Sequence, residues 1–159
     1  MAETKPDASS TVPWPPIIYA GSALVAAIAS WLSGWPFEPL AERSYIRAGS
    51  ALLFLAGIAI LLAAGMRFNK AKTPIPPTVP TKTLVFEGIY QFTRNPMYLG
   101  MTSILAGLGL AFDQLWFLIA VPIAMFAVTK LAIEREEAYL ARRFGEPYLA
   151  YKSKVRRWL

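Results

Sequence analysis

The chain has 159 residues, of which 55% are hydrophobic, and its mean hydropathy is +0.41. It is too apolar for an ordinary soluble protein and too short for several domains, so residues 1–159 are expected to form one membrane-embedded domain. Cys and His are absent, which excludes disulfides, the usual zinc sites and the commonest general base, and predicts no metal site. The net charge of +6 fits nucleic acid, anionic lipid or cytoplasmic loops of a membrane protein.

The N-terminal residues 1–13 contain acidic residues and proline and lack a basic segment leading into a short apolar core. This pattern does not resemble a signal peptide. We expect a flexible tail before the first apolar segment.

Four apolar segments follow, which predicts an all-α integral membrane protein with about four transmembrane helices. The first two lie within residues 14–65, and the last two within residues 96–133. Only Asp113 and Gln114 separate the third segment from the fourth, so these two should form a tight helical hairpin. The four segments are Ile17–Ser33, Tyr45–Gly65, Met97–Phe112 and Leu115–Ile133.

The third segment carries small residues, Gly100, Ala106, Gly107 and Gly109. In a membrane such residues let helix backbones approach closely. Gly107 and Gly109 also form a GxG pattern, which occurs in nucleotide sites. Helix packing is the favoured interpretation.

The loop 66–95 contains four prolines within seven residues, between Pro74 and Pro80. Proline favours an extended, stiff chain over helix, so this strap should deliver the following residues to one place. The loop then runs into the block GIYQFTRNPMYLG, Gly88 to Gly100.

In that block, Asn95 and Pro96 are typical of an N-cap and a first-turn proline opening the third helix. A helix N-terminus with exposed amides suits a carboxylate or an electron-rich edge of a ligand. Tyr90 lies before this cap and Tyr98 lies just inside the helix. Both rings could border such a ligand, although anchoring at the membrane interface would also explain them.

The second polar block, residues 134–159, begins with Glu134, Glu136 and Glu137. Glu134 is expected at a solvated helix end with an i to i+4 partner. Glu136 projects from another face, at the membrane edge, where a carboxylate could bind ribose hydroxyls or a cationic cofactor.

Aromatic side chains recur in this block at near-helical spacing among basic residues. They predict cytoplasmic interfacial C-terminal helices, broken near Gly145. These aromatic residues are Phe144, Tyr148, Tyr151 and Trp158.

Basic residues concentrate in two regions, the loop 66–95 and the C-terminal block 134–159. The positive-inside rule therefore places both regions and both termini in the cytoplasm, as expected in a bacterial-type inner membrane. The basic bias is then a topology signal, and we expect no nucleic-acid binding. The residues are Arg67, Lys70, Lys72, Lys82, Arg94, Arg135, Arg142, Arg143, Lys152, Lys154, Arg156 and Arg157.

The combination of GIYQFTRNPMYLG with EEAYLARRFGEPYLAYKSKVRRWL strongly resembles the integral-membrane methyltransferases that include isoprenylcysteine carboxyl methyltransferases and phospholipid N-methyltransferases. The resemblance covers about residues 73–159. It implies a C-terminal half that binds S-adenosyl-L-methionine and a lipid or small apolar acceptor that arrives from the bilayer.

Matching positions imply which residues contact the cofactor and which act in catalysis. The cofactor-binding set is Lys82, Thr83, Leu84, Val85, Tyr90, Asn95, Pro96, Met97, Tyr98 and Glu136, with Lys82–Val85 as a strand-like entry. The catalytic candidates are Glu136, Glu137, Tyr98 and Arg94. An amine acceptor must lose a proton, and the first three of these could take it.

The resemblance also bears on the acceptor. Asn95 stands where prenylcysteine enzymes usually have His, whereas phospholipid N-methyltransferases resemble this chain in having Asn. Ala132 lies roughly where prenylcysteine enzymes place an Arg. A phospholipid amine is therefore the favoured acceptor, with an isoprenylcysteine-type carboxyl acceptor as the alternative.

Two other functions stay open from the sequence. Sterol reductases share a similar C-terminal pattern, which would make NADPH the cofactor. A non-catalytic membrane protein also fits the length and the apolar content. Nothing in the sequence determines the oligomeric state.

Overall fold

The computed structural model describes residues 14–34, 44–76 and 78–159, and every regular element within these ranges is a helix. The all-α prediction is confirmed for these residues. The expected flexible tail, residues 1–13, lies outside them. The longer helices are α1 (Trp14–Ser33), α2 (Ser44–Lys70), α3 (Pro96–Ala111), α4 (Leu115–Val128), α5 (Glu134–Phe144) and α6 (Glu146–Lys154).

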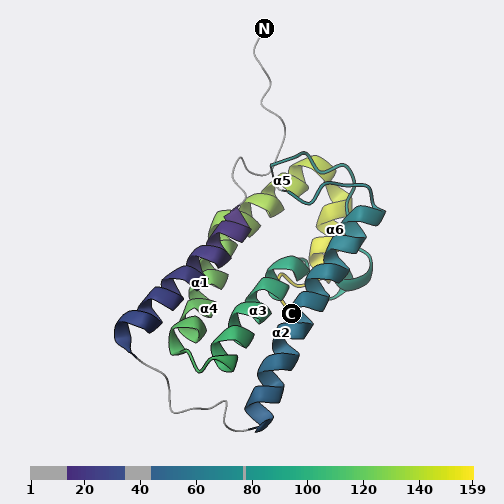
Figure 1. Ribbon diagram of the computed structural model, residues 1–159. Helices are drawn as coiled ribbons and strands as arrows, with labels where there is room; N and C mark the ends of the chain where they lie inside the picture. Colours follow the sequence, from purple (N-terminus) through teal and green to yellow (C-terminus); the bar gives the residue numbers. More distant parts are fainter. Residues whose placement is uncertain (1–13, 35–43, 77) are drawn as a thin grey trace.

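Four of these helices run lengthwise beside one another, with α3 and α4 between α1 and α2 (Figure 1). Helix α2 packs along α3, and α1 packs along α4. Helices α3 and α4 also contact each other, joined by a turn in which the Gln114 amide donates to the Gly109 carbonyl at 2.8 Å. The expected pairing of these two helices is therefore present.

Glycines set the close approach of the helices. A Cβ on Gly57 of α2 would lie 2.7 Å from the Gly100 carbonyl oxygen of α3, and one on Gly107 would lie 2.9 Å from the Phe54 nitrogen. A Cβ on Gly109 would instead meet side chains of α4. The GxG pattern thus serves helix packing, as favoured from the sequence, but Gly100 and Gly107 face α2 rather than the hairpin partner α4.

Helix α4 does not end at Ile133. A π-helical turn, Thr129–Ile133, joins it directly to α5, so residues Leu115–Phe144 form one continuous helix of 30 residues. The prediction that a separate cytoplasmic helix begins at Glu134 is wrong, because the charged residues extend the last apolar helix instead of ending it. Its polar end reaches beyond the other helices toward the strap (Figure 1).

Three helices are long and apolar enough to cross a membrane, namely α1, α2 and the helix Leu115–Phe144. Helix α3 is apolar but has only 16 residues, which at 1.5 Å each reach roughly 24 Å, short of a hydrocarbon core of about 30 Å. Among the described helices, α3 is thus the one whose length falls below a full span.

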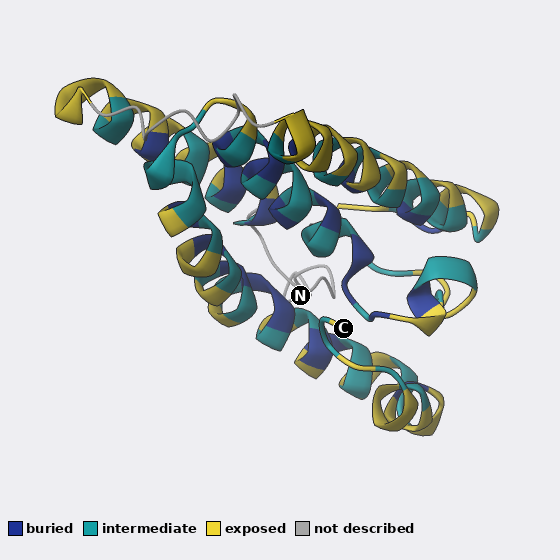
Figure 2. Cartoon of the chain, turned by 90° about the horizontal axis from the view of Figure 1, so that it is seen from below, coloured by how far each residue is buried: buried dark blue, intermediate teal, exposed yellow. Residues whose placement is uncertain are grey.

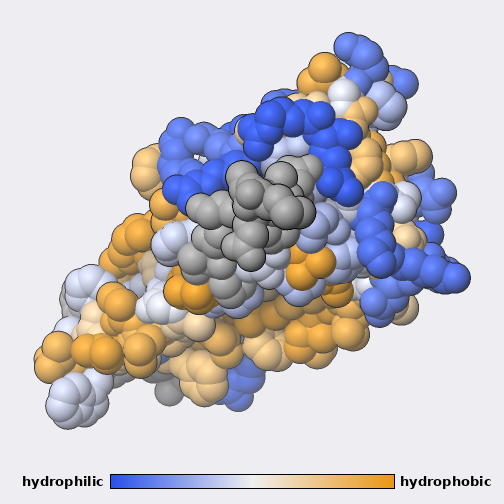
Figure 3. Space-filling model, turned by 90° about the horizontal axis from the view of Figure 1, so that it is seen from above, coloured by the Kyte–Doolittle hydropathy of each residue, from blue (hydrophilic) through white to orange (hydrophobic). Residues whose placement is uncertain are grey.

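Apolar side chains cover the outside of these helices. Leu24, Leu52, Leu62 and Phe126 are each more than half exposed, and buried residues line the sides of the helices that face one another (Figure 2). Figure 3 views the molecule from the α5 end and shows hydrophilic residues gathered around that end, with apolar residues over the helices beyond it. This surface is suited to lipid, with a polar cap at one end.

Candidate functional site

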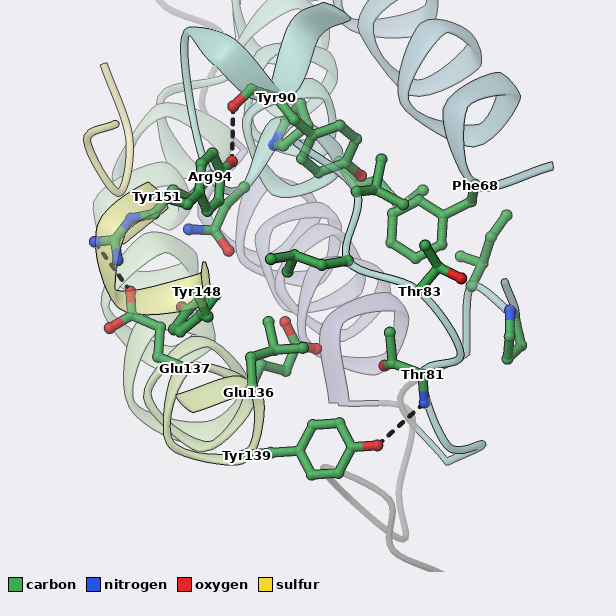
Figure 4. Close-up of a pocket in the computed structure, with 18 of the residues that line it drawn as sticks. Phe68, Thr81, Thr83, Tyr90, Arg94, Glu136, Glu137, Tyr139, Tyr148 and Tyr151 are labelled. Atoms are coloured by element: carbon green, nitrogen blue, oxygen red, sulfur yellow. Dashed lines mark hydrogen bonds and ion pairs between the residues drawn. The ribbon is translucent and has the colours of Figure 1, made fainter. Parts of the chain in front are cut away.

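A pocket lies at the polar end, between the strap, the start of α3, and helices α5 and α6 (Figure 4). Its space is about 890 Å³ when the part open to solvent is included, and small-molecule sites commonly have about 300–1,000 Å³. The lining residues are Phe68, Pro74, Ile75, Pro76, Thr81, Thr83, Leu84, Val85, Tyr90, Arg94, Asn95, Pro96, Met97, Tyr98, Glu136, Glu137, Tyr139, Leu140, Tyr148 and Tyr151.

The strap forms one wall and is held by side chains rather than by a sheet. The Thr73 hydroxyl accepts from the Lys82 amide at 2.9 Å and from the Thr83 amide at 3.4 Å. The Tyr139 hydroxyl of α5 accepts from the Thr81 amide at 3.1 Å (Figure 4). The expected strand-like segment is therefore an extended loop, since proline removes ladder donors, and the described residues contain no strand.

The start of α3 forms the second wall. Pro96 occupies the first turn as predicted, and the Asn95 carbonyl accepts the Leu99 amide at 3.0 Å. The Asn95 side chain makes no capping bond. Its amide instead donates to the Arg157 carbonyl at 2.9 Å, so the predicted side-chain cap is wrong, because the C-terminal segment competes for that group.

Glu136 and Tyr98 join the second wall to α5. The Tyr98 hydroxyl donates to Oε1 of Glu136 at 2.6 Å, which is the short distance of a hydrogen bond to an ionised acceptor. Glu136 projects into the pocket, whereas Glu134 forms an exposed ion pair with Lys130 at 2.7 Å (Figure 4). The different roles expected for these two carboxylates are supported by this geometry.

Glu137 is surrounded by cations. Arg157 binds it with both arms of the guanidinium fork, Nε to Oε1 at 2.9 Å and Nη2 to Oε2 at 3.0 Å. Lys152 lies 3.2 Å from Oε2, and Arg94 lies 3.3 Å from Oε1. Because both oxygens are occupied, the carboxylate is suited to holding α5, α6 and the start of α3 together rather than to accepting a proton.

Arg94 keeps donors for something else. Its side chain is only 10% exposed, and its Nε and Nη1 atoms are buried without a hydrogen-bond partner in the protein. A buried donor without an acceptor costs about 1–3 kcal/mol, and more for a charged group. Since Arg94 lines the pocket, these donors are placed for a ligand acceptor.

Aromatic rings make up much of the remaining wall. Phe68 and Tyr90 have ring centroids 5.7 Å apart, and those of Tyr148 and Tyr151 are 6.3 Å apart. The Tyr151 hydroxyl donates to the Tyr90 carbonyl at 2.7 Å (Figure 4). Burial raises the pKa of Tyr148 to about 12, and it also raises the pKa values of Tyr90 and Tyr151. These phenols keep their protons near neutral pH and act as binding groups.

The structure brings the residues expected at a site around this one pocket, except Lys82, which does not line it. Sequence reasoning missed Phe68, Tyr139, Tyr148 and Tyr151 as lining residues. Tyr148 and Tyr151 were expected at the membrane interface, but they point into the pocket. Tyr139 follows Glu136 by three residues, a spacing that places both on one helix face, and this signal could have identified it.

Known proteins match much of the chain. Residues 45–147 match the family model described as phospholipid methyltransferase. The protein-S-isoprenylcysteine O-methyltransferases of Rattus norvegicus and Homo sapiens are 27% and 28% identical over 141 residues, which cover 82% of this chain and 48% of each relative. An uncharacterized protein of Haemophilus influenzae is 40% identical over 63 residues, which cover 40% of this chain and 100% of that protein.

The chain therefore spans about half the length of the isoprenylcysteine methyltransferases that it matches. No solved structure matches it. The family match extends from α2 through α3, α4 and α5 to the start of α6, and so includes the helices that carry the pocket. Because this match covers more than half of the sequence, the chain belongs to the phospholipid methyltransferase family.

Proposed function

We propose that this chain is a methyltransferase that uses S-adenosylmethionine and acts on a lipid or small apolar acceptor at the cytoplasmic membrane surface. Family membership supports the reaction class, and the apolar helices support the membrane location. One observation carries the choice of cofactor. At the end of the apolar helices, a single pocket combines aromatic walls, the carboxylate of Glu136 and the unpartnered donors of Arg94.

These groups fit the chemical parts of the cofactor. The methionyl carboxylate would accept from Nε and Nη1 of Arg94, which have no acceptor in the protein. The sulfonium would lie among aromatic faces and near Glu136, because cations are attracted both to ring faces and to carboxylates. When bound, the cofactor supplies a methyl group that a nucleophile can displace in line.

The chain's own residues would then orient the reactants. Aligned reactants in a closed site can lower a barrier by about 7–11 kcal/mol, and no His is needed for this. The bond from Tyr98 fixes one oxygen of Glu136, which leaves the other oxygen to face the ligand. Glu136 is therefore the group we assign to attracting an amine acceptor and taking its proton, while Glu137 holds the walls together.

A phospholipid amine is the acceptor we favour. A carboxylate in the pocket attracts an ammonium headgroup and repels a carboxylate acceptor. Ala132, at the position where a prenylcysteine enzyme would place an Arg, is buried at 3% exposure among apolar side chains. The similarity to isoprenylcysteine O-methyltransferases makes carboxyl methylation the second candidate. Family membership favours either over the membrane reductase.

We also propose that α3 crosses the membrane as a short fourth span. It lies between α2 and α4, which shield much of its surface, and a bilayer adapts to a short segment at modest cost. The pocket and its basic residues would then face the cytoplasm together with both termini. A bacterial-type inner membrane would provide this arrangement.

The test uses the folded protein in detergent. Isothermal titration should show one site for S-adenosylmethionine and for S-adenosylhomocysteine, whereas NADPH should not compete. Protein in vesicles containing phosphatidylethanolamine should then transfer label from methyl-labelled cofactor to that lipid. Label on S-farnesylcysteine alone would favour the second candidate, and no binding of either adenosyl compound would contradict the proposal.

A further inference from the structure

The C-terminal segment lies against the start of α3, although it does not line the pocket. The Arg94 amide donates to the Arg156 carbonyl at 2.9 Å. The Arg157 carbonyl accepts from the Asn95 side-chain amide at 2.9 Å and from the Thr93 hydroxyl at 3.2 Å. The backbone of this segment thereby fixes Thr93–Asn95, the residues that lead into the pocket.

The side chain of Arg157 reaches the other wall. Its guanidinium forms two parallel bonds with Glu137 of α5, a geometry that strengthens and orients an ion pair. The Glu137 side chain is 8% exposed, while that of Arg157 is 34% exposed. One residue therefore joins the two polar blocks, with its carbonyl on the first and its side chain on the second.

This pairing determines how Arg94 meets Glu137. Arg157 occupies both carboxylate oxygens, and Lys152 approaches one of them. Arg94 is left with a single contact, from Nη2 at 3.3 Å, and its Nε and Nη1 atoms stay unpartnered. Without the Arg157 fork, Glu137 would be free to bind Arg94 through two bonds and so consume donors that now face the pocket.

We propose that Arg157 is a positioning residue that occupies Glu137 and thereby keeps the donors of Arg94 available for the carboxylate of the bound ligand. The proposal rests on the function proposed above. It predicts that losing the Arg157 side chain weakens only those ligands that carry the carboxylate. A general disturbance of the pocket would weaken all ligands alike.

The experiment measures two dissociation constants on the full chain in detergent. One ligand is S-adenosylhomocysteine, and the other is its decarboxylated analogue, which lacks only the carboxylate. Arg157→Gln should weaken S-adenosylhomocysteine about tenfold, equivalent to about 1.4 kcal/mol, and should change the analogue less than twofold. Lys154→Gln removes a charge nearby from an exposed side chain and should change neither.

Two further variants sharpen the result. Arg157→Lys keeps the charge but not the fork, so it should recover part of the affinity for S-adenosylhomocysteine and gives a readout if Arg157→Gln does not fold. Arg94→Gln combined with Arg157→Gln should bind no more weakly than Arg94→Gln alone, because both changes remove the same contact.

The outcomes separate this proposal from the function. Equal weakening of both ligands, or unchanged affinity for S-adenosylhomocysteine in Arg157→Gln, would overturn the positioning role and leave the function standing. Failure of the unmodified protein to bind either ligand would overturn both.

Discussion

The polar end of the molecule and its apolar helices are held together by different means. At the polar end, directed contacts such as Tyr98 with Glu136 and Arg157 with Glu137 join segments distant in sequence. Among the apolar helices, contact depends on shape, as where Gly57 lies against Gly100. Changes at the first region should therefore alter the pocket, whereas changes at the second should alter how the helices assemble.

The largest effect is expected where the polar end is most strongly linked. Glu137→Gln would leave Arg94, Arg157 and Lys152 without their shared counter-charge. Removing one partner of a buried ionic group costs about 3–5 kcal/mol, so the free energy of unfolding should fall by about 3 kcal/mol. Thermal unfolding followed by tryptophan fluorescence measures this, with the exposed Glu134→Gln as the matched control. Equal stability of the two variants would contradict the linking role.

Glu136→Gln should affect ligand binding rather than stability. Its side chain can still accept the bond from Tyr98, but the charge facing the cofactor is lost. Affinity for S-adenosylmethionine should fall by about 30-fold, or about 2 kcal/mol, as measured by isothermal titration. Glu134→Gln should bind normally. Unchanged affinity in Glu136→Gln would remove Glu136 from the proposed site.

A methyl group on Gly57 should act on the helices alone. Its Cβ would lie 2.7 Å from the Gly100 carbonyl, and overpacking of this kind costs about 1–3 kcal/mol. Gly49→Ala is the control, because nothing lies within 4 Å of its Cβ, and it should be neutral or slightly stabilising. The comparison between the two regions fails if Gly57→Ala lowers cofactor affinity at unchanged stability.

Tyr19→Phe should produce the smallest effect. The Tyr19 hydroxyl joins α1 to α3 through the Thr102 hydroxyl at 2.7 Å and the Tyr98 carbonyl at 3.1 Å. Removing it should cost about 1 kcal/mol of stability in the same unfolding measurement. A loss of several kcal/mol would show that α1 depends on this contact more than on its apolar surface.

Apolar composition predicted the helices because a membrane-compatible segment needs little else to identify it. It could not predict where α4 ends, since the charges at Glu134–Glu137 suggested a helix end and the π-turn carries the helix past them. The partner of Gly107 was equally hidden, because a small residue indicates close packing but not which helix approaches.

The candidate site was predictable to the extent that two motifs carried it. Tyr98 and Glu136 were expected near one ligand, and they are hydrogen-bonded. Asn95 was assigned to capping because its local sequence favours that, but its actual acceptor, the Arg157 carbonyl, lies 62 positions away. Such a contact depends on how the C-terminal segment docks, which local sequence patterns do not encode.

Photo-crosslinking of labelled S-adenosylmethionine to the folded protein, followed by mapping of the labelled peptides, tests the central claim most directly. The account predicts label within residues 89–98 or 136–151, competition by S-adenosylhomocysteine, and loss of label in Glu136→Gln. Label confined to other segments, or label displaced by NADPH and not by S-adenosylhomocysteine, would contradict it.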